Sequence, residues 1–349
     1  MDTFLTHLAQ AFGGRVGADV LGNFDADRWM GFPANLPHER EKAWSATTLA
    51  HLLRDPQAFQ RVYELFEDEQ SRQLFIQLIL YRLLGHRRVR LPRNDDEHWM
   101  LRDRAHALQG AESQFGGVFG KLHRFDLEFE GQRVIADCWW ANTAWTFLIR
   151  QYYLERDDVL VRPLPEDCVI DAGACFGDTA LAFAVSAGEK GRVHAFEIDP
   201  LNLEIARHNI ALNPTLGSRI TLCEAALGDT EAKRYLYGSG PGAQVLEQPG
   251  GRQVNMTTLD RYVEQAEIKR VDFIKMDIEG AELGALQGAA ATIAKFKPRL
   301  AISLYHRPDD LIRIPLWLNA LNLEYAFFLE HYTIHYEESI LYARPVKSN

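Results

Sequence analysis

The sequence is poor in cysteine, and the few cysteines it has follow no organised spacing. Cys138, Cys168, Cys175 and Cys223 are scattered and form no C-x-x-C pair. Structural zinc sites and disulfide frameworks both depend on tighter spacings than this. We therefore expect reduced thiols, which is the usual state of cysteine in the cytoplasm.

Long apolar runs are absent as well. No stretch approaches the roughly 20 consecutive apolar residues that span a bilayer. The first residues, Met1 to Leu5, lack the basic leader and apolar run of a signal peptide. These absences predict a cytoplasmic protein with no membrane among its partners.

Positive charge is also in deficit. The chain of 349 residues has 38 Lys and Arg against 48 Asp and Glu, which gives a formal net charge of −10. Because nucleic-acid binding depends on cations that neutralise phosphates, we expect no nucleic-acid partner. A basic run over residues 86–93 is the exception, but it has no interleaved aromatic residues and is typical of a solvated segment.

The N-terminal third of the chain has the periodicity of helices. Asp55 followed by Pro56 predicts the start of one helix, since the pair reads as an N-cap and a first helical position. A broad apolar face predicts a second helix from Glu69 to Leu84. No catalytic pattern occurs in this region. The expected domains are a helical region over 1–110 and a second domain over 111–349, with its core at 166–343.

From Cys168 onward, short apolar runs alternate with helical patterns, which is typical of a mostly parallel sheet covered by helices. A hairpin is expected before it, over 124–135. Two final runs, 324–328 and 339–343, are expected to pair antiparallel at the sheet edge. The expected strands are 168–171, 192–197, 219–224, 271–276 and 299–305, with helices near 178–187, 200–212, 257–267 and 279–295 and a turn-rich insertion over 238–251.

One glycine-containing turn after the strand at 168–171 carries the strongest chemical signal. Small residues there let a ligand approach the backbone closely. In open sheets of this kind, ligands bind outside the carboxyl ends of the strands, where this turn lies. The residues that we expect to contact a cofactor are Asp171, Ala172, Gly173, Ala174, Gly177, Asp178 and Thr179.

The spacing of this turn separates two classes of cofactor. The dinucleotide fingerprint is G-x-G-x-x-G, whereas here three residues separate Gly173 from Gly177 and an acid, Asp171, precedes them. A carboxylate at that position would repel a pyrophosphate, but it suits a cofactor with an amino group and a sulfonium cation. We therefore favour S-adenosylmethionine, and a nicotinamide oxidoreductase is the alternative from a different class.

Acidic residues also end the two strands that follow. Glu197, with Ile198 after it, ends the second strand, and a carboxylate there can accept hydrogen bonds from both ribose hydroxyls. Glu224 and Ala225 end the third strand, where we expect them to border an adenine. Three acids at three successive strand ends reinforce the prediction of a nucleoside cofactor.

Four stretches carry a family signal beyond the pattern above, namely 171–180, 195–200, 258–262 and 272–282. With them, the sequence resembles the FkbM family of methyltransferases. The resemblance covers roughly residues 120–343 and implies a Rossmann-like class I methyltransferase fold, an α/β fold whose mostly parallel seven-stranded sheet has an antiparallel edge strand. It also implies S-adenosylmethionine-dependent methylation, mostly of hydroxyl oxygens in polyketides and sugars, although some members resemble N-methyltransferases of peptide side chains.

The ends of the last two parallel strands provide candidates for the reaction itself. Asp277 and Glu282 follow the strand at 271–276, and His306 follows the strand at 299–305. We predict that His306 is the general base, assisted by Asp277, because histidine titrates near neutral pH. We expect Asp277 and Glu282 to face the acceptor or the sulfonium, so Asp277 is also a predicted cofactor contact. His331 and Tyr332 are expected to touch the acceptor from the turn after the penultimate strand. A divalent ion held by Asp277, Glu282 and His306 is chemically possible, but the spacing is not diagnostic and no metal is predicted.

These features together favour an O-methyltransferase that acts on a sugar, a glycan or a secondary metabolite. The alternative within the same chemistry is an N-methyltransferase of peptide side chains, which would not need a strong base at His306. A non-catalytic scaffold that binds a partner through its N-terminal helices is a third possibility. The intact glycines of the turn, together with Glu197 and Asp277, argue against a cofactor fold that has become vestigial. The expected partner is a small-molecule, glycan or peptide acceptor.

Overall fold

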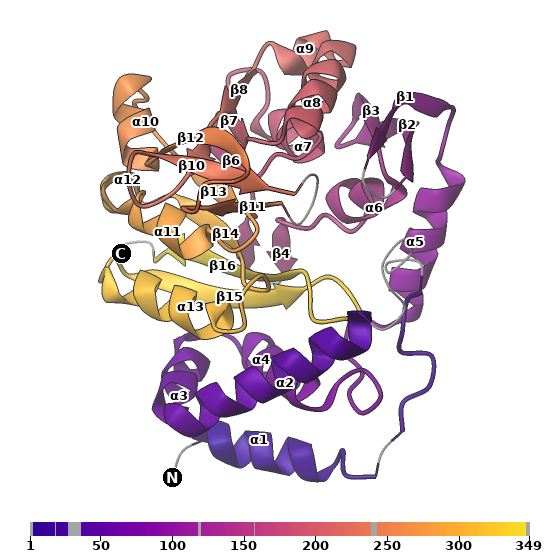
Figure 1. Ribbon diagram of the computed structural model, residues 1–349, viewed down its shortest axis with the longest axis vertical. Coiled ribbons are helices and arrows are strands. Elements are labelled where there is room, and N and C mark those ends of the chain that lie inside the picture. Colours follow the sequence, from indigo (N-terminus) through magenta and orange to yellow (C-terminus); the bar gives the residue numbers. More distant parts are fainter. Residues whose placement is uncertain are drawn as a thin grey trace. The chain divides into compact units, whose positions relative to one another are not determined.

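The computed structural model describes residues 3–17, 19–26, 36–117, 120–156, 158–238 and 243–346 (Figure 1). The chain divides into two compact units, one made of residues 1–99 with 303–349 and the other of residues 100–302. The C-terminal segment thus groups with the N-terminal helices, and the predicted domain boundary near residue 110 stays a prediction. The predicted turn-rich insertion at 238–251 lies partly outside the described residues.

A seven-stranded sheet with the order β15-β16-β14-β13-β6-β7-β8 organises the fold. Its strands are labelled in Figure 1. Strands β14, β13, β6, β7 and β8 are parallel to their neighbours in that order, and β15 and β16 form the antiparallel pair at the edge. The predicted class I methyltransferase fold is confirmed. The strands are β6 (Cys168–Ala172), β7 (Arg192–Glu197), β8 (Ile220–Glu224), β13 (Phe273–Met276), β14 (Arg299–Ser303), β15 (Tyr325–His331) and β16 (Ser339–Pro345).

The helices between these strands begin and end close to their predicted limits, with one exception. The single helix predicted over 279–295 was wrong, because the structure has two short helices there. Glu279 and Gly280 have positive φ angles of 56° and 95°, which delays the start of the first helix. Gly288 lies between the two helices, where a Cβ would meet the carbonyl oxygen of Gly228 at 2.0 Å. The helices are α7 (Asp178–Ala187), α8 (Pro200–Leu212), α9 (Pro214–Gly217), α10 (Leu259–Gln265), α11 (Glu282–Gln287) and α12 (Ala290–Phe296).

The segment before β6 contains the predicted hairpin, which is confirmed by the antiparallel pairing of β2 (Gly120–Phe129) with β3 (Gln132–Cys138). Its turn places Glu130 and Gly131 at φ angles of 48° and 76°, which is typical of a two-residue hairpin turn. A π-helix, Thr143–Leu148, follows. The remaining elements before β6 are α5 (Asp96–Ala107), β1 (Glu112–Gly117), α6 (Trp140–Asn142), β4 (Leu154–Arg156) and β5 (Val159–Val161). A separate four-stranded sheet follows β8 in the chain. It consists of β9 (Ala226–Leu227), β10 (Ala232–Tyr237), β11 (Gln244–Leu246) and β12 (Arg252–Thr257).

The unit that contains both termini is built from helices and the edge strands. Asp55 accepts a hydrogen bond from the backbone N–H of Ala58 at 3.0 Å, so the predicted N-cap is confirmed. Ser71 accepts one from the backbone N–H of Leu329 at 2.9 Å, which joins the helix at 69–84 to β15. No described helix is long and apolar enough to cross a bilayer. The helices are α1 (Thr3–Gly13), α2 (Leu36–Arg54), α3 (Pro56–Leu65), α4 (Glu69–Leu84) and α13 (Asp310–Ala320).

Candidate active site

The turn after β6 is held between its two neighbouring strands. The backbone N–H groups of Gly173 and Ala174 both donate to the carbonyl oxygen of Phe196, at 3.0 and 2.9 Å. Gly173 has a φ angle of +82°, and a Cβ at this position would lie 1.9 Å from the carbonyl oxygen of Asp277. Only glycine fits there, because the turn after β6 and the backbone after β13 touch. The result is a rigid cradle with its small residues at the carboxyl ends of the strands.

Asp171 lies underneath this cradle, and its side chain is 0% exposed. Its Oδ1 atom is 3.1 Å from the ammonium group of Lys275, and its Oδ2 atom accepts a hydrogen bond from the Thr179 hydroxyl at 2.6 Å. The buried carboxylate is therefore paired inside the protein. Its predicted contact with the cofactor stays a prediction, as does that of Thr179.

Asp178 begins α7, and its carboxylate connects the cradle to the segment that contains the π-helix. The hydroxyl of Thr146 donates to it at 2.6 Å, and the side-chain amide of Asn142 donates at 3.3 Å. Burial raises the pKa of Asp178, and the hydrogen bond from Thr146 opposes that shift. An acid at the first turn of a helix also interacts favourably with the helix dipole.

Glu197 at the end of β7 is buried and held in one orientation. Its Oε1 atom accepts hydrogen bonds from the backbone N–H groups of Ile198 and Asp199, at 2.6 and 2.8 Å. Its Oε2 atom accepts one from the side-chain amide of Asn202 at 3.3 Å. Burial raises the pKa of Glu197, and these three hydrogen bonds oppose the shift. These bonds use three of the roughly four lone-pair sites of the carboxylate, so one site on Oε2 remains to accept a hydroxyl hydrogen bond.

Glu224 ends β8, directly beside Glu197 in the register of the sheet. Its side chain is exposed and forms ion pairs with Arg207 and Arg252, each at 3.2 Å. Ala225 follows the strand end. The structure thus places both residues at the predicted edge, and their contact with an adenine stays a prediction.

The loop after β13 brings Asp277 to the same edge. Its Oδ2 atom accepts a hydrogen bond from the hydroxyl of Tyr152 at 2.5 Å. Glu282 is 0% exposed, and its Oε1 atom accepts a hydrogen bond from the backbone N–H of Ile278 at 2.8 Å. Glu282 therefore closes the loop that carries Asp277, and its predicted contact with the acceptor stays a prediction.

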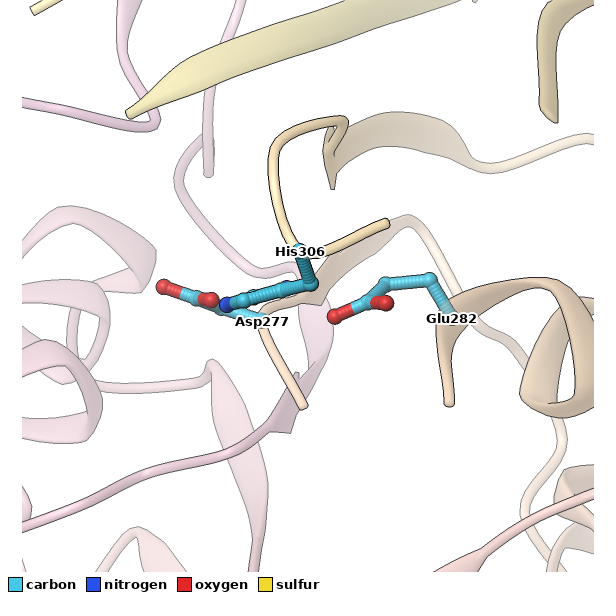
Figure 2. Close-up of side chains that lie close together, drawn as sticks. All are labelled: Asp277, Glu282 and His306. Atoms are coloured by element: carbon cyan, nitrogen blue, oxygen red, sulfur yellow. The ribbon is translucent and has the colours of Figure 1, made fainter. Parts of the chain in front are cut away.

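His306 comes three residues after the end of β14, which runs parallel to β13. Figure 2 shows the side chains of Asp277, Glu282 and His306. Asp277 and Glu282 lie on the loop and the first helical turn after β13, and the role of His306 with them stays a prediction. Carboxylates and imidazole are also ligands that divalent cations accept.

His331 and Tyr332 form hydrogen bonds within buried pairs. His331 was predicted to lie in a turn, which was wrong, because it is the last residue of β15 and pairs with Ser339. Its Nδ1 atom is 2.9 Å from the Ser339 hydroxyl, and the hydroxyls of Tyr332 and Tyr342 are 2.6 Å apart. That either side chain touches the acceptor stays a prediction.

Two residues that the sequence pattern did not single out lie at the centre of this site. Tyr152 has a φ angle of +74°, and Arg150 just before it has one of +60°. Strained backbone of this kind clusters at functional sites, and π-helical turns occur there too. Lys275 is fully buried under the turn. A lone charge within the apolar strand Phe273–Met276 was the one signal that pointed to it.

Comparisons with known proteins agree with this geometry. Residues 171–329 match the family described as the methyltransferase FkbM domain. A crystal structure of methyltransferase FkbM from Methylobacillus flagellatus is similar in fold, with a TM-score of 0.55 and 21% identity over 84% of this chain. This chain spans 60% of the length of that structure.

Two further solved structures are similar at a lower level. Aeropyrum pernix fibrillarin in complex with S-adenosyl-L-methionine has a TM-score of 0.37 and 13% identity over 67% of this chain and 98% of its own. An O-methyltransferase from Bacillus cereus has a TM-score of 0.33 and 16% identity over 51% of this chain and 73% of its own. No curated protein matches the sequence.

Proposed function

Since residues 171–329 form a methyltransferase FkbM domain on a class I S-adenosylmethionine-dependent fold, we propose that the protein methylates a hydroxyl group of a sugar, a glycan or a secondary metabolite. One observation carries the proposal. The rigid cradle at Gly173 touches the backbone of Asp277, so the cofactor turn and the reactive loop share one edge of the sheet.

The residues at this edge fit S-adenosylmethionine. Gly173 has no side chain, so the turn can pack directly against the backbone of Asp277, and Glu197 presents an oriented carboxylate to which a ribose hydroxyl can donate. Asp178 and Asp277 supply negative charge for an ammonium and a sulfonium group. When bound, the cofactor supplies an electrophilic methyl group attached to a positively charged sulfur.

The acceptor hydroxyl must lose its proton as it attacks that methyl group. We assign His306 as the general base, a role that contributes on the order of 10²–10⁴-fold to a rate. Asp277 orients the imidazole or the acceptor, and Tyr152 fixes Asp277 through the hydrogen bond to its Oδ2 atom. The remaining catalysis is positioning, because an in-line displacement depends on the alignment of the two reactants.

Mass spectrometry tests this proposal directly. The protein is incubated with S-adenosylmethionine and a panel of hydroxylated sugars, glycans and polyketides, beside peptides with amide and amine side chains. Gain of one methyl group on a hydroxyl oxygen supports the proposal. Methylation of peptide nitrogen alone would favour the N-methyltransferase, and calorimetric binding of a nicotinamide dinucleotide without S-adenosylmethionine would favour an oxidoreductase.

Replacing Glu197 with alanine is expected to weaken S-adenosylmethionine binding by about tenfold or more, because a hydrogen bond to a charged acceptor is lost. Titration calorimetry measures the change. Since burial raises the pKa of Glu197, its charged form is lost earlier than usual as the pH falls. Wild-type affinity should therefore weaken on acidification, and Glu197→Gln should remove that dependence. Unchanged affinity of Glu197→Ala would rule out the ribose assignment.

Replacing Tyr152 with phenylalanine is expected to lower kcat by about tenfold or more, since a hydrogen bond to a charged group is lost while the ring stays. S-adenosylmethionine affinity should change little. Tyr153→Phe is the matched control, because this adjacent buried tyrosine bonds Ser186 at 3.1 Å instead of Asp277. Equal losses of kcat in the two variants would contradict the role of Tyr152.

We also propose a cytoplasmic location. All four cysteines are unpaired with one another, which suits a reducing compartment. Fractionation of cells that express the tagged protein tests the location, and recovery from an extracytoplasmic fraction would contradict it.

A further inference from the structure

Lys275 places a full positive charge in the middle of the central sheet. It is the third residue of β13, and its side chain is 1% exposed. In the register of the sheet it lies beside Asp171 on β6. The residues flanking this pair on the outer strands are small, Ala301 on β14 and Ala195 on β7. The small neighbours leave room for two charged side chains that are otherwise rare in a core.

Two backbone carbonyl groups and one carboxylate lie around the ammonium group of Lys275. It donates to the carbonyl oxygens of Ala172 at 3.1 Å and Gly173 at 2.6 Å. It also forms an ion pair with Asp171, whose Oδ1 atom lies 3.1 Å away. The aromatic ring of Tyr152 lies 5.2 Å from the same nitrogen. The two carbonyl groups and the carboxylate thus all belong to the cofactor turn or to Asp171, which precedes it.

Lys275 remains charged despite its burial. Desolvation alone lowers its pKa, but the carboxylates of Asp171, Asp277 and Asp178 raise it, and the net shift is upward. A buried ion pair is by itself a poor source of stability, because removing both charges from water costs about as much as their attraction returns. The ion pair is therefore better explained by the backbone carbonyl groups that Lys275 holds in place than by a gain in stability.

We propose that Lys275 is a positioning residue that fixes the cofactor turn by holding the carbonyl groups of Ala172 and Gly173. Phe196 holds the N–H groups of Gly173 and Ala174 from the opposite side, so the turn is clamped between β13 and β7. Asp171 neutralises the ammonium and acts on the cofactor through the turn. The expected effect on S-adenosylmethionine affinity rests on the proposed function, whereas the effect on the turn itself does not.

Lys275→Met is the test variant, because methionine keeps much of the side-chain length and removes the charge and the donors. Arg299→Met is the matched control. Arg299 also forms a buried ion pair on the same sheet, with Asp167 at 2.5 Å, but it lies at the first residue of β14, at the other end of the strands. Both variants should lose thermal stability. Titration calorimetry with S-adenosylmethionine and S-adenosylhomocysteine should show at least about tenfold weaker binding only for Lys275→Met.

Amide hydrogen exchange of the protein without cofactor gives a second readout. The N–H groups of Gly173 and Ala174 should exchange faster in Lys275→Met and at the wild-type rate in Arg299→Met, even if the wild type were found to bind no S-adenosylmethionine. Wild-type exchange of these two amides in Lys275→Met would overturn the proposal.

The double variant Asp171→Asn/Lys275→Met separates the clamp from simple charge balance. Removing both charges should recover much of the thermal stability that Lys275→Met loses. The fast exchange of Gly173 and Ala174 and the weak binding should remain, because the carbonyl groups stay unheld. Recovery of wild-type exchange and affinity in the double variant would show that charge balance alone matters, and the proposal would fall.

Discussion

Gly173→Ala is expected to weaken S-adenosylmethionine binding by at least about a hundredfold, the size of effect that a displacement near 1 Å produces at an active site. The added Cβ would lie 1.9 Å from the carbonyl oxygen of Asp277, a backbone atom that cannot rotate away. The turn and the loop after β13 must therefore separate. Calorimetry of cofactor binding and the midpoint of thermal unfolding measure the two consequences.

Gly188→Ala is the matched control for this change. Gly188 also has a positive φ angle, +69°, but an added Cβ there meets nothing within 4 Å. The control variant isolates the backbone strain, which costs about 1–2 kcal/mol for a non-glycine residue. It should lose stability of that order and bind the cofactor normally. If Gly173→Ala binds as well as Gly188→Ala, the close contact with Asp277 does not shape the site.

His306→Ala is expected to lower kcat by about 10²–10⁴-fold with any acceptor that the protein methylates, because the proton of the hydroxyl then has no base. Cofactor affinity should be unchanged. Steady-state kinetics with the acceptor identified by mass spectrometry measures the effect. Turnover that survives the substitution would exclude His306 as the base and would favour a nitrogen acceptor, which does not need one.

His194→Ala is a suitable control for that experiment. His194 is half-buried on β7 and its Nδ1 atom lies 2.8 Å from the hydroxyl of Tyr262, so its removal also costs a hydrogen bond. It has no place in the proposed reaction, and kcat should stay near the wild-type value. A similar fall in kcat for both variants would point to general destabilisation.

The strand ends were predictable because their chemistry is local. Asp171, Glu197 and Asp277 each end or directly follow an apolar run, and parallel strands bring such positions to one edge. The helix Asp310–Ala320 was missed for a local reason too. Pro315 lies inside it, and proline usually argues against the interior of a helix.

Contacts between segments that are distant in the sequence could not be predicted from local sequence patterns. Nothing in the residues around Tyr152 indicates that its hydroxyl meets Asp277, because the sequence separation is 125 residues and the backbone there is strained. The burial of Glu282 against its own loop was hidden for a different reason. A glutamate at the start of a helix looks the same in sequence whether it faces solvent or closes a turn.

The π-helix at Thr143–Leu148 has a consequence for how this segment can change over evolutionary time. It contains Thr146, which holds Asp178, and it ends just before the segment with Tyr152, which holds Asp277. Loss of one residue from the wide turn would restore an α-helical turn and rotate all that follows by about 100°. Substitutions in this segment can alter its surface, but an insertion or a deletion would break the link between the two carboxylates. The number of residues is therefore the quantity to preserve when such segments are exchanged between relatives.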